Sequence, residues 1–429
     1  MQIYNVKPAK SVQGEIAVPG DKSISHRSIM LGSIARGTTS VRGFLRGEDN
    51  FSTLNAFRAM GVAVEDDGET LRIEGKGLHG LAEPFDILDC GNSGTSMRLM
   101  TGLLAGQRFF SILTGDRYLR NRPMKRVLEP LSHMGAAIFG RAGGDRAPLA
   151  IVGKELTGID YASPVASAQV KSAIMLAGLY ASGTTTISEP HLSRDHSERM
   201  LRYFGGDIEP FAGGVRVRGG RELEGRDIVV PGDISSSAFF MVAALIVPGS
   251  ELLIRGVGVN PTRTGILDIL TAMGGSIDLV DCREVSGEPV ADILVRSSRL
   301  HGIEIGGDLV PRAIDEFPVL CVAAALAEGR TIVREAKELR VKETDRIAAM
   351  AANLRNAGVD VTETEDGMEI EGRGRLLGGT FESRGDHRIA MSMLVAGLAA
   401  EGEVTVNDVE CIATSFPNFM ALLDRVAIR

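Results

Sequence analysis

A sixfold internal repeat constrains the fold of this 429-residue chain more than any other feature. Each copy opens with a polar segment rich in Ser, Asp and Arg, continues with about ten mostly small apolar residues, and reaches a glycine followed by a short β-like run. Such spacing is typical of folds assembled from equivalent supersecondary units. The six glycines, which lie 66 to 80 residues apart, are Gly37, Gly106, Gly183, Gly249, Gly329 and Gly402.

Each unit is expected to contain two helices of different character. The first, as in 172–183 and 390–402, is apolar nearly all round, which indicates a helix buried in a core. Short alternating segments such as 70–75 and 214–219 predict half-buried strands, so the fold class is α/β. The second helix is amphipathic, and in five units it is closed by a glycine: Gly61, Gly135, Gly205, Gly274 and Gly358.

Charged and reactive residues concentrate before or within the first turn of each apolar helix. A helix N-terminus presents unpaired N–H groups and stabilises a nearby anion by about 0.3–1 kcal/mol. If the units pack alike, several N-termini point into shared space, and an anion-binding cleft is expected. The formal net charge of −8 argues against nucleic acid or an anionic membrane as the main partner.

Three early segments offer ligands for anions. Lys22, Ser23 and Arg27 lie within about one helical turn and could clamp phosphate or carboxylate, although a capped, solvated helix end is the plainer interpretation. Gly94 belongs to a glycine-containing turn with exposed N–H groups, or to an ordinary helix start. Arg122 precedes a proline, which restricts its backbone; it forms part of either an anion clamp or a solvated basic loop.

Later segments add polar and acidic candidates. Ser167 and Gln169 could hydrogen-bond a polyhydroxy ligand, and Arg194 belongs to a charged segment that could equally be a surface ion-pair cluster. Asp315 lies at the edge of an apolar stretch, where partial burial would raise its pKa and suit a general base, unless it is simply an N-cap.

The last candidates come from two charged segments near the end of the chain. Lys342, Glu343 and Arg346 open an amphipathic helix and could form either a reactive cluster or a salt-bridged surface turn. Arg388 begins the last buried helix and is the stronger ligand candidate there, whereas the adjacent His387 could be structural.

The sequence contains no signal for a metal, a disulfide framework or a membrane span. HExxH, EF-hand and clustered Cys/His patterns are absent, and the four cysteines are far apart without a CxxC pair. We therefore expect no cofactor and a reducing, cytoplasmic location. The N-terminus lacks an apolar signal-peptide core, and the longest apolar runs, such as 238–248, are too short to cross a bilayer.

Taken in order, the segments GDKSISHR, GNSGTSMR, NRPM, SAQ, AIDEFPVL, RVKETDR and GDHR resemble those of the enolpyruvyl transferases. The resemblance is closest to the 5-enolpyruvylshikimate-3-phosphate synthase family (3-phosphoshikimate 1-carboxyvinyltransferases), and to its second sequence class. It covers essentially the whole chain. It implies two similar domains, each with three β/α repeats around buried parallel helices (the inverse α/β barrel type). One domain would join residues 1–21 to 231–429, the other would hold 22–230, and the active site would lie between them.

The same resemblance implies transfer of the enolpyruvyl group of phosphoenolpyruvate to the 5-hydroxyl of shikimate 3-phosphate, with release of phosphate. This is a step of the shikimate pathway toward chorismate and the aromatic amino acids, and it uses no metal or organic cofactor. The family is expected to be monomeric and cytoplasmic, with two small anions as its partners and neither nucleic acid nor membrane.

Roles follow by motif match. Shikimate 3-phosphate would be bound by Lys22, Ser23, Arg27, Ser167, Gln169, Arg194, Asp315 and Lys342, and phosphoenolpyruvate by Lys22, Gly94, Arg122, Gln169, Arg346 and Arg388. The catalytic residues would be Asp315, Glu343, Lys342 and Lys22. Asp315 would take the hydroxyl proton, and Lys342 or Glu343 would protonate the methylene carbon.

Two departures from the family pattern bear on ligand binding. Many members carry a lysine near the C-terminal Phe-Pro pair, where this chain has Thr414. Some second-class members carry alanine at the position of Gly94 and exclude the inhibitor glyphosate, so Gly94 leaves inhibitor sensitivity open.

Three alternatives are weighed against this interpretation. UDP-N-acetylglucosamine 1-carboxyvinyltransferases share the chemistry but use a reactive cysteine in a mobile loop, and the loop 114–123 has none. A six-repeat DNA clamp ring needs Lys and Arg along its repeated helices, which here are apolar. A catalytically inactive binding protein of the same fold is opposed by the full set Lys22, Arg122, Asp315, Glu343 and Arg388.

Overall fold

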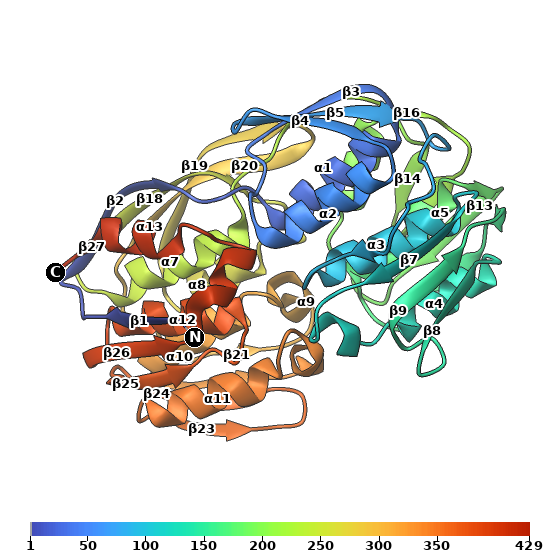
Figure 1. Ribbon diagram of the computed structural model, residues 1–429. Coiled ribbons are helices and arrows are strands. Elements are labelled where there is room, and N and C mark those ends of the chain that lie inside the picture. The colour runs from blue at the N-terminus through green and yellow to red at the C-terminus, as the bar shows by residue number, and fades with distance from the viewer. Residues whose placement is uncertain (1) are drawn as a thin grey trace. The chain divides into compact units, whose positions relative to one another are not determined.

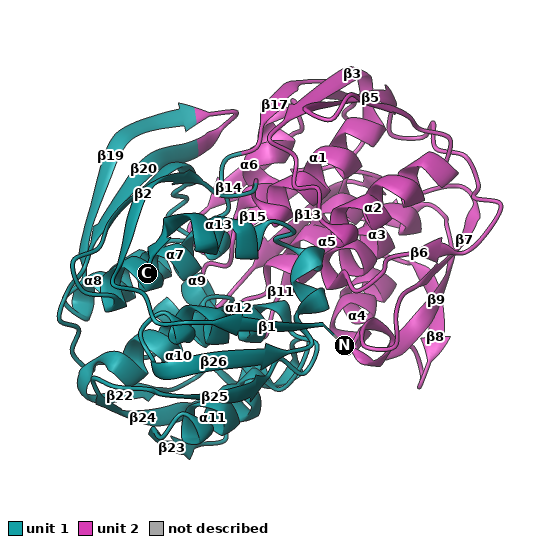
Figure 2. Ribbon diagram, turned by 60° about the vertical axis from the view of Figure 1, so that its left-hand side comes forward, with its two compact units in different colours: residues 1–19, 231–284, 289–429 teal, residues 20–230, 285–288 magenta. Residues whose placement is uncertain are grey.

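The computed structural model describes residues 2–429, which form two compact units, each with its own hydrophobic core. Unit 1 holds the N-terminal segment up to Pro19, together with Pro231–Glu284 and Pro289–Arg429. Unit 2 holds Gly20–Val230 and Val285–Glu288 (Figure 2).

One helix of each repeat is buried along nearly its whole length, as the apolar stretches predicted. In unit 2, α3 packs against α1 and α5; in unit 1, α7, α10 and α12 pack against one another (Figure 1). Small residues permit this contact: a Cβ atom on Gly102 of α3 would lie 2.0 Å from the carbonyl oxygen of Ala173 in α5. The buried helices are α1 (Lys22–Ile34), α3 (Gly94–Ala105), α5 (Ala168–Gly178), α7 (Ile234–Ile246), α10 (Phe317–Leu326) and α12 (His387–Gly397).

The second helices are also confirmed, and a further one was missed. The five glycines predicted to close them all have φ between 81° and 94°, a left-handed conformation that glycine adopts without steric cost. The missed helix is α13 (Phe419–Val426), which continues directly into strand β27 (Ala427–Ile428) and therefore lacks the closing glycine. The predicted ones are α2 (Glu48–Ala59), α4 (Lys125–His133), α6 (His196–Tyr203), α8 (Gly265–Ala272) and α11 (Arg346–Asn356).

The sheets of unit 2 share one pattern of strand pairing. In each of the three larger sheets, a strand that follows a buried helix pairs in parallel with a short strand from elsewhere and antiparallel with one strand of the following hairpin. The sheets are β16 (Leu223–Glu224) and β17 (Asp227–Val229) with β3 (Ala35–Arg42), β5 (Thr70–Lys76) and β4 (Ala63–Asp66); β6 (Leu88–Asp89), β7 (Phe110–Thr114), β9 (Arg146–Val152) and β8 (Ala137–Arg141); β11 (Asp160–Ala162), β13 (Thr184–Ser188), β15 (Gly214–Arg218) and β14 (Ile208–Phe211); and the pair β10 (Leu156–Thr157) and β12 (Ala181–Ser182).

Unit 1 repeats the pattern, and the N-terminal strand completes its last sheet. Strand β1 pairs antiparallel with β26, with Ile3 opposite Asn407. The sheets are β19 (Ser276–Val285), β20 (Glu288–Arg296), β18 (Glu251–Gly258), β2 (Ser11–Ala17) and β27 (Ala427–Ile428); β21 (Glu304–Ile305), β22 (Glu328–Val333), β24 (Met368–Arg373) and β23 (Asp360–Glu363); and β1 (Ile3–Val6), β26 (Glu401–Asn407) and β25 (Leu377–Glu382).

Four short helices lie beside the predicted site segments: η1 (Leu119–Asn121), α9 (Leu309–Ala313), η2 (Lys337–Val341) and η3 (Val409–Thr414). No helix within residues 2–429 combines the length and apolar character needed to cross a membrane. The predicted α/β class, with repeated β/α units around buried helices, is confirmed.

Candidate active site

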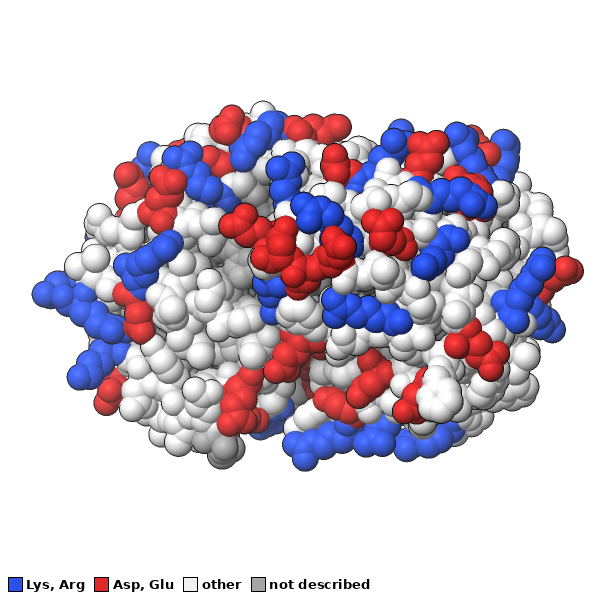
Figure 3. Space-filling view, turned by 45° about the horizontal axis from the view of Figure 1, so that its top comes forward, with Lys and Arg blue, Asp and Glu red and all other residues white. Residues whose placement is uncertain are grey.

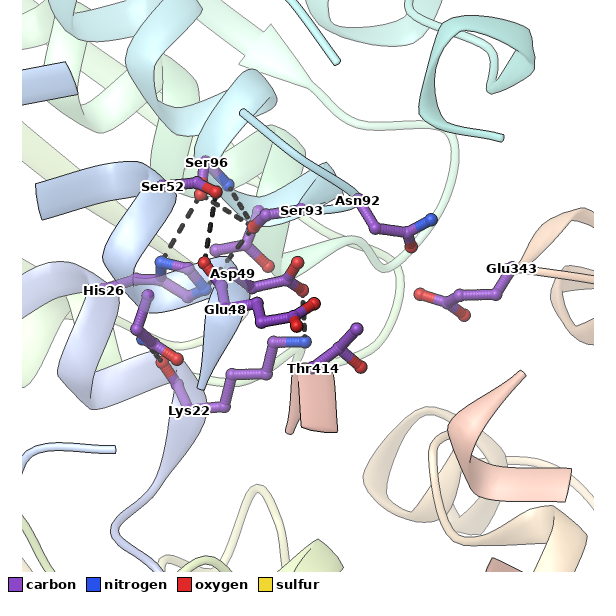
Figure 4. A network of polar contacts seen from close by, with 12 residues as sticks. Lys22, His26, Glu48, Asp49, Ser52, Asn92, Ser93, Ser96, Glu343 and Thr414 are labelled. Carbon is purple, nitrogen blue, oxygen red and sulfur yellow. Dashed lines mark hydrogen bonds and ion pairs between the residues drawn. The ribbon is translucent and has the colours of Figure 1, made fainter. Parts of the chain in front are cut away.

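Lys22 is the first residue of α1, and its placement depends on two aspartates. Asp21 caps the helix by accepting a hydrogen bond from the backbone N–H of Ile24 at 2.8 Å. The Lys22 ammonium lies 2.5 Å from Oδ2 of Asp49 in α2, and about a fifth of the Lys22 side chain remains exposed. The ammonium is therefore held at a helix N-terminus by Asp49 (Figure 4), on a side chain that is not fully buried.

His26, a residue that was not predicted from the sequence, joins three helices of unit 2. Its Nδ1 lies 2.8 Å from the Thr53 hydroxyl of α2, and its Nε2 lies 3.4 Å from the hydroxyl of Ser93, the N-cap of α3 (Figure 4). Burial, reinforced by the charges of Lys22 and Arg27, holds the pKa of His26 well below its usual range. His26 is thus a neutral link that fixes the start of α3 relative to α1.

Arg27 is buried, and its guanidinium is bound by unit 2 itself. Nε donates to the Ser197 hydroxyl at 2.7 Å, Nη2 donates to the Ser172 hydroxyl at 2.9 Å, and Nη1 donates to the carbonyl of Ser23 at 3.0 Å. Burial lowers the pKa of Arg27 to about 10, and the positive charge of Arg194 acts in the same direction. Arg194 therefore lies close enough to Arg27 for the two charges to repel.

Two guanidinium groups converge beside Gly94, the first residue of α3. A Cβ atom at this position would lie 2.8 Å from Nη1 of Arg122 and 2.9 Å from Nη1 of Arg98. Arg122 has the extended backbone that its following proline requires, with φ −79° and ψ 143°. Only glycine leaves room for both cations at this helix N-terminus, which is the arrangement expected for an anion site.

Gln169 has a fixed amide orientation at the start of α5. Its Oε1 accepts a hydrogen bond from Nη1 of Arg98 at 2.5 Å, and its Nε2 donates to the Thr95 hydroxyl at 2.9 Å. Arg98 also donates to the carbonyl of Pro123 at 3.2 Å, so one buried arginine ties three predicted motifs together. Ser167 is the N-cap of the same helix and accepts from the N–H of Val170.

In unit 1, Asp315 lies in the turn between α9 and α10 rather than inside a helix. Its Oδ1 lies 3.8 Å from the ammonium of Lys342 and 3.5 Å from Nη1 of Arg346. Its carbonyl accepts a hydrogen bond from Nη1 of Arg388 at 3.0 Å. Three predicted cations from two separate segments therefore meet the predicted base.

Arg346 is almost fully buried and pairs with three carboxylates. Nη2 lies 2.7 Å from Glu343, Nε lies 2.8 Å from Asp386, and the third partner is Asp315. Burial by itself would lower the pKa of Arg346, but these carboxylates outweigh it and raise the pKa. Arg346 remains a cation, and it holds Glu343 and Asp315 on opposite arms of one guanidinium.

The pKa of Lys342 is also set by burial acting against nearby carboxylates, but here the outcome is the opposite of that at Arg346. Burial dominates and lowers the pKa of Lys342 below the ordinary 10.5, although Asp315 and Glu343 oppose the shift. An ammonium with a lowered pKa releases a proton more readily, which suits general acid catalysis.

Thr414, where many relatives carry lysine, ends η3, and its hydroxyl donates to the carbonyl of Cys411 at 2.7 Å.

Asp49 and Asp386 were missed, although each pairs with a predicted cation. Asp386 is fully buried and caps α12, and it directly precedes the His-Arg pair that was recognised. Asp49 belongs to the second helix of its repeat, which its periodicity predicts to be an amphipathic surface helix. Asp386 had a local signal as a capping residue, whereas nothing near Asp49 in sequence indicates that it pairs with Lys22.

Comparison with known structures first defines the class of this fold. The enolpyruvyl transferase NikO from Streptomyces tendae is 18% identical, covers 99% of this chain and 97% of its own, and superimposes with a TM-score of 0.79. At that identity the similarity establishes the fold alone, which is that of the enolpyruvyl transferases.

Closer relatives identify the family. Residues 6–423 match the family described as EPSP synthase (3-phosphoshikimate 1-carboxyvinyltransferase). EPSP synthase from Acinetobacter baumannii is 50% identical, covers 100% of this chain and 99% of its own, and has a TM-score of 0.89. The 3-phosphoshikimate 1-carboxyvinyltransferases of Geotalea uraniireducens and Geobacter metallireducens are 82% and 78% identical, each over 100% of both chains. This chain belongs to the EPSP synthase family of enzymes.

The DNA-clamp alternative is not supported. The repeated helices are buried and apolar, so they have no basic surface to present. On the face drawn in Figure 3, acidic and basic side chains are interspersed.

Proposed function

We propose that this chain transfers the enolpyruvyl group of phosphoenolpyruvate to the 5-hydroxyl of shikimate 3-phosphate and releases inorganic phosphate. The observation that carries this proposal is the 82% identity, over the full length of both chains, to a 3-phosphoshikimate 1-carboxyvinyltransferase. The predicted site residues also gather in two sets, one in each unit.

The set in unit 2 is suited to binding anions. Arg122 approaches the N-terminus of α3 beside Gly94, and Lys22 begins α1. Guanidinium groups form charge-assisted hydrogen bonds with carboxylate and phosphate oxygens, and helix N-termini add their dipoles. We assign phosphoenolpyruvate to the Gly94–Arg122 position, and shikimate 3-phosphate to Ser167, Gln169 and Arg194, with Lys22 and Ser23 contacting substrate and Arg27 supporting them.

The set in unit 1 is suited to proton transfer. Asp315 would remove the proton of the 5-hydroxyl as its oxygen attacks C2 of phosphoenolpyruvate, while Lys342 or Glu343 delivers a proton to C3. General acid–base assistance of this kind contributes roughly 10²–10⁴-fold. Arg346 and Arg388 hold Asp315 in place and offer positive charge to the phosphoenolpyruvate anion.

The resulting tetrahedral adduct carries phosphate on C2. Cleavage of the C2–O bond to phosphate, with loss of a proton from the C3 methyl group, restores the methylene and yields the enolpyruvyl ether. The base formed at Lys342 or Glu343 would take back the proton from C3, and the protonated carboxyl of Asp315 would give its proton to the departing phosphate, so that both groups return to their starting state.

Phosphate release assayed with each acceptor separately tests the proposal. Phosphoenolpyruvate with shikimate 3-phosphate should release one phosphate per acceptor consumed, and phosphoenolpyruvate with UDP-N-acetylglucosamine should release none. The reverse result would assign enolpyruvyl transfer to UDP-N-acetylglucosamine instead. No phosphate release with either acceptor, across a range of pH and salt, would refute catalysis.

Unit 1 and unit 2 are proposed to be the two domains of the enzyme, both serving this one reaction. The four cysteines are free thiols, which fits the reducing cytoplasm that we propose as its location. We further propose a monomer in solution; light scattering after gel filtration, giving the mass of one chain or of two, tests this.

A further inference from the structure

Beneath the start of α5, a lysine and two glutamates form a buried cluster with no role in the reaction described above. Lys171 has 3% of its side chain exposed, Glu189 has 1% and Glu198 has 8%. A buried ion cluster is not by itself a favourable way to stabilise a fold, because removing charges from water offsets much of their attraction. Its geometry therefore calls for another explanation.

The ammonium of Lys171 uses all three of its N–H donors inside unit 2. It lies 2.9 Å from Glu189 and 2.7 Å from Glu198, and it donates to the carbonyl of Ser193 at 3.2 Å. Burial alone would lower the pKa of Lys171, but Glu198 and Glu189 outweigh it and raise the pKa, so the lysine stays charged. The cluster joins α5 to the loop 189–195, which connects β13 to α6.

Glu189 is the centre of this connection. Its Oε1 accepts a hydrogen bond from the backbone N–H of Ser167 at 3.2 Å. The same carboxylate accepts from the hydroxyl of Ser193 at 2.7 and 2.8 Å and from the Ser193 N–H at 3.3 Å. One side chain thus fixes the backbone at Ser167 and at the residue immediately before Arg194.

Ser167 and Arg194 come from segments 27 positions apart, and neither segment is a regular element at that point. A loop arginine holds a phosphate only if its backbone is fixed, since misplacement by about 1 Å can cost about 100-fold in rate. Hydrogen-bonded buried networks specify one geometry more sharply than apolar packing does. The cluster supplies that constraint to both residues at once.

We propose that Lys171 and Glu189 are positioning residues, which set the geometry of Ser167 and Arg194 for binding shikimate 3-phosphate. The proposal rests on the function proposed above, because it assumes that Ser167 and Arg194 contact that substrate. On this proposal the buried cluster affects the affinity for shikimate 3-phosphate, and it affects neither the chemical step nor the affinity for phosphoenolpyruvate.

The test compares Glu189→Gln, which keeps the shape but removes the charge, with Ser193→Ala, which removes only the hydroxyl. Phosphate release is measured while each substrate is varied, and binding of shikimate 3-phosphate alone is measured by calorimetry. We expect Glu189→Gln to raise KM and Kd for shikimate 3-phosphate at least tenfold, and Ser193→Ala to raise them about threefold. The KM for phosphoenolpyruvate, measured at saturating shikimate 3-phosphate, should stay at its wild-type value in both variants.

A double-mutant cycle separates positioning from general weakening of the fold. If Glu189 acts partly through Arg194, the effect of Glu189→Gln should be clearly smaller in an Arg194→Ala background. As a matched control, Ile151→Ala removes a fully buried side chain from β9, a strand that carries no site residue. It should lower Tm without changing the KM for shikimate 3-phosphate.

Unchanged KM and Kd for shikimate 3-phosphate in both variants, with an active wild type, would overturn this inference and leave the proposed function intact. An equal rise of the KM for shikimate 3-phosphate in the Ile151→Ala control would also overturn it. So would full additivity between the effects of Glu189→Gln and Arg194→Ala. If Glu189→Gln does not fold, Ser193→Ala decides the question alone. A wild-type protein that neither binds shikimate 3-phosphate nor releases phosphate would instead refute the proposed function.

Discussion

Replacing Gly94 with alanine should weaken phosphoenolpyruvate binding without weakening the fold. The added Cβ would lie 2.8 Å from Nη1 of Arg122 and 2.9 Å from Nη1 of Arg98, where ordinary contact begins at 3.4 Å. The guanidinium of Arg122 must therefore retreat by at least about 0.6 Å, the difference between 2.8 and 3.4 Å. Guanidinium groups end flexible side chains, so they move and the helix does not.

The size of the effect follows from the interaction that is lost. A hydrogen bond to a charged group is worth about 1.5–3 kcal/mol, which corresponds to about 10-fold to 150-fold in affinity. Stability should change in the opposite direction, because alanine is favoured over glycine in a helix by up to about 1 kcal/mol. We expect the KM for phosphoenolpyruvate to rise at least tenfold while Tm stays unchanged or rises.

The assay is steady-state phosphate release with phosphoenolpyruvate varied at saturating shikimate 3-phosphate. The KM for shikimate 3-phosphate serves as an internal control and should stay within about threefold. An unchanged KM for phosphoenolpyruvate in a folded Gly94→Ala variant would show that the position beside Gly94 and Arg122 does not bind this substrate. A lowered Tm would show that the helix, and not the guanidinium groups, absorbs the clash.

Three further predictions concern residues assigned by sequence and located by the structure. Arg122→Ala should raise the KM for phosphoenolpyruvate at least tenfold; an unchanged value would remove Arg122 from the site. Asp315→Asn should lower kcat by about 10²-fold or more with folding intact, because the hydroxyl proton loses its acceptor; near-normal turnover would assign the base elsewhere. The pKa of Lys342 is lowered from 10.5, so kcat/KM should fall on an alkaline limb below pH 10.5, and Lys342→Arg should move that limb to higher pH. A limb that stays in place in the arginine variant would exclude Lys342 as its origin.

The same lowered pKa has a consequence for stability. Between the pKa of Lys342 in the folded protein and its ordinary 10.5, the unfolded chain binds more protons than the folded one. The contribution of Lys342 to the free energy of unfolding therefore rises with pH across that window.

The repeated pattern in the sequence was sufficient to predict the buried helices, the closing glycines and the α/β class. The burial of a helix can be predicted from its own residues, because a helix that is apolar on all sides can lie only inside a core. The helix α13 escaped detection because it lacks the local glycine on which the pattern depended. The pairing of β1 with β26 escaped because it joins residues about 400 positions apart.

The candidate residues were likewise visible in sequence, because their motifs are local and occur in a fixed order. Their partners were not. That Arg346 divides its guanidinium among Asp315, Glu343 and Asp386 depends on packing between α10, α11 and α12. Lys342 and Arg346 share the carboxylates of Asp315 and Glu343, yet their pKa values shift in opposite directions. Burial dominates at Lys342, whereas Asp386 also acts on Arg346 and helps to outweigh burial there.

Local sequence patterns were therefore sufficient to predict which residue types begin each buried helix, because helix periodicity and capping are properties of neighbouring residues. Which of those residues are in contact could be learned only from the folded molecule, in which Gly94 makes space for two guanidinium groups and Glu189 binds both Ser167 and Ser193. Distances between side chains from different repeats are set by the packing of whole helices, and no local stretch of sequence encodes them.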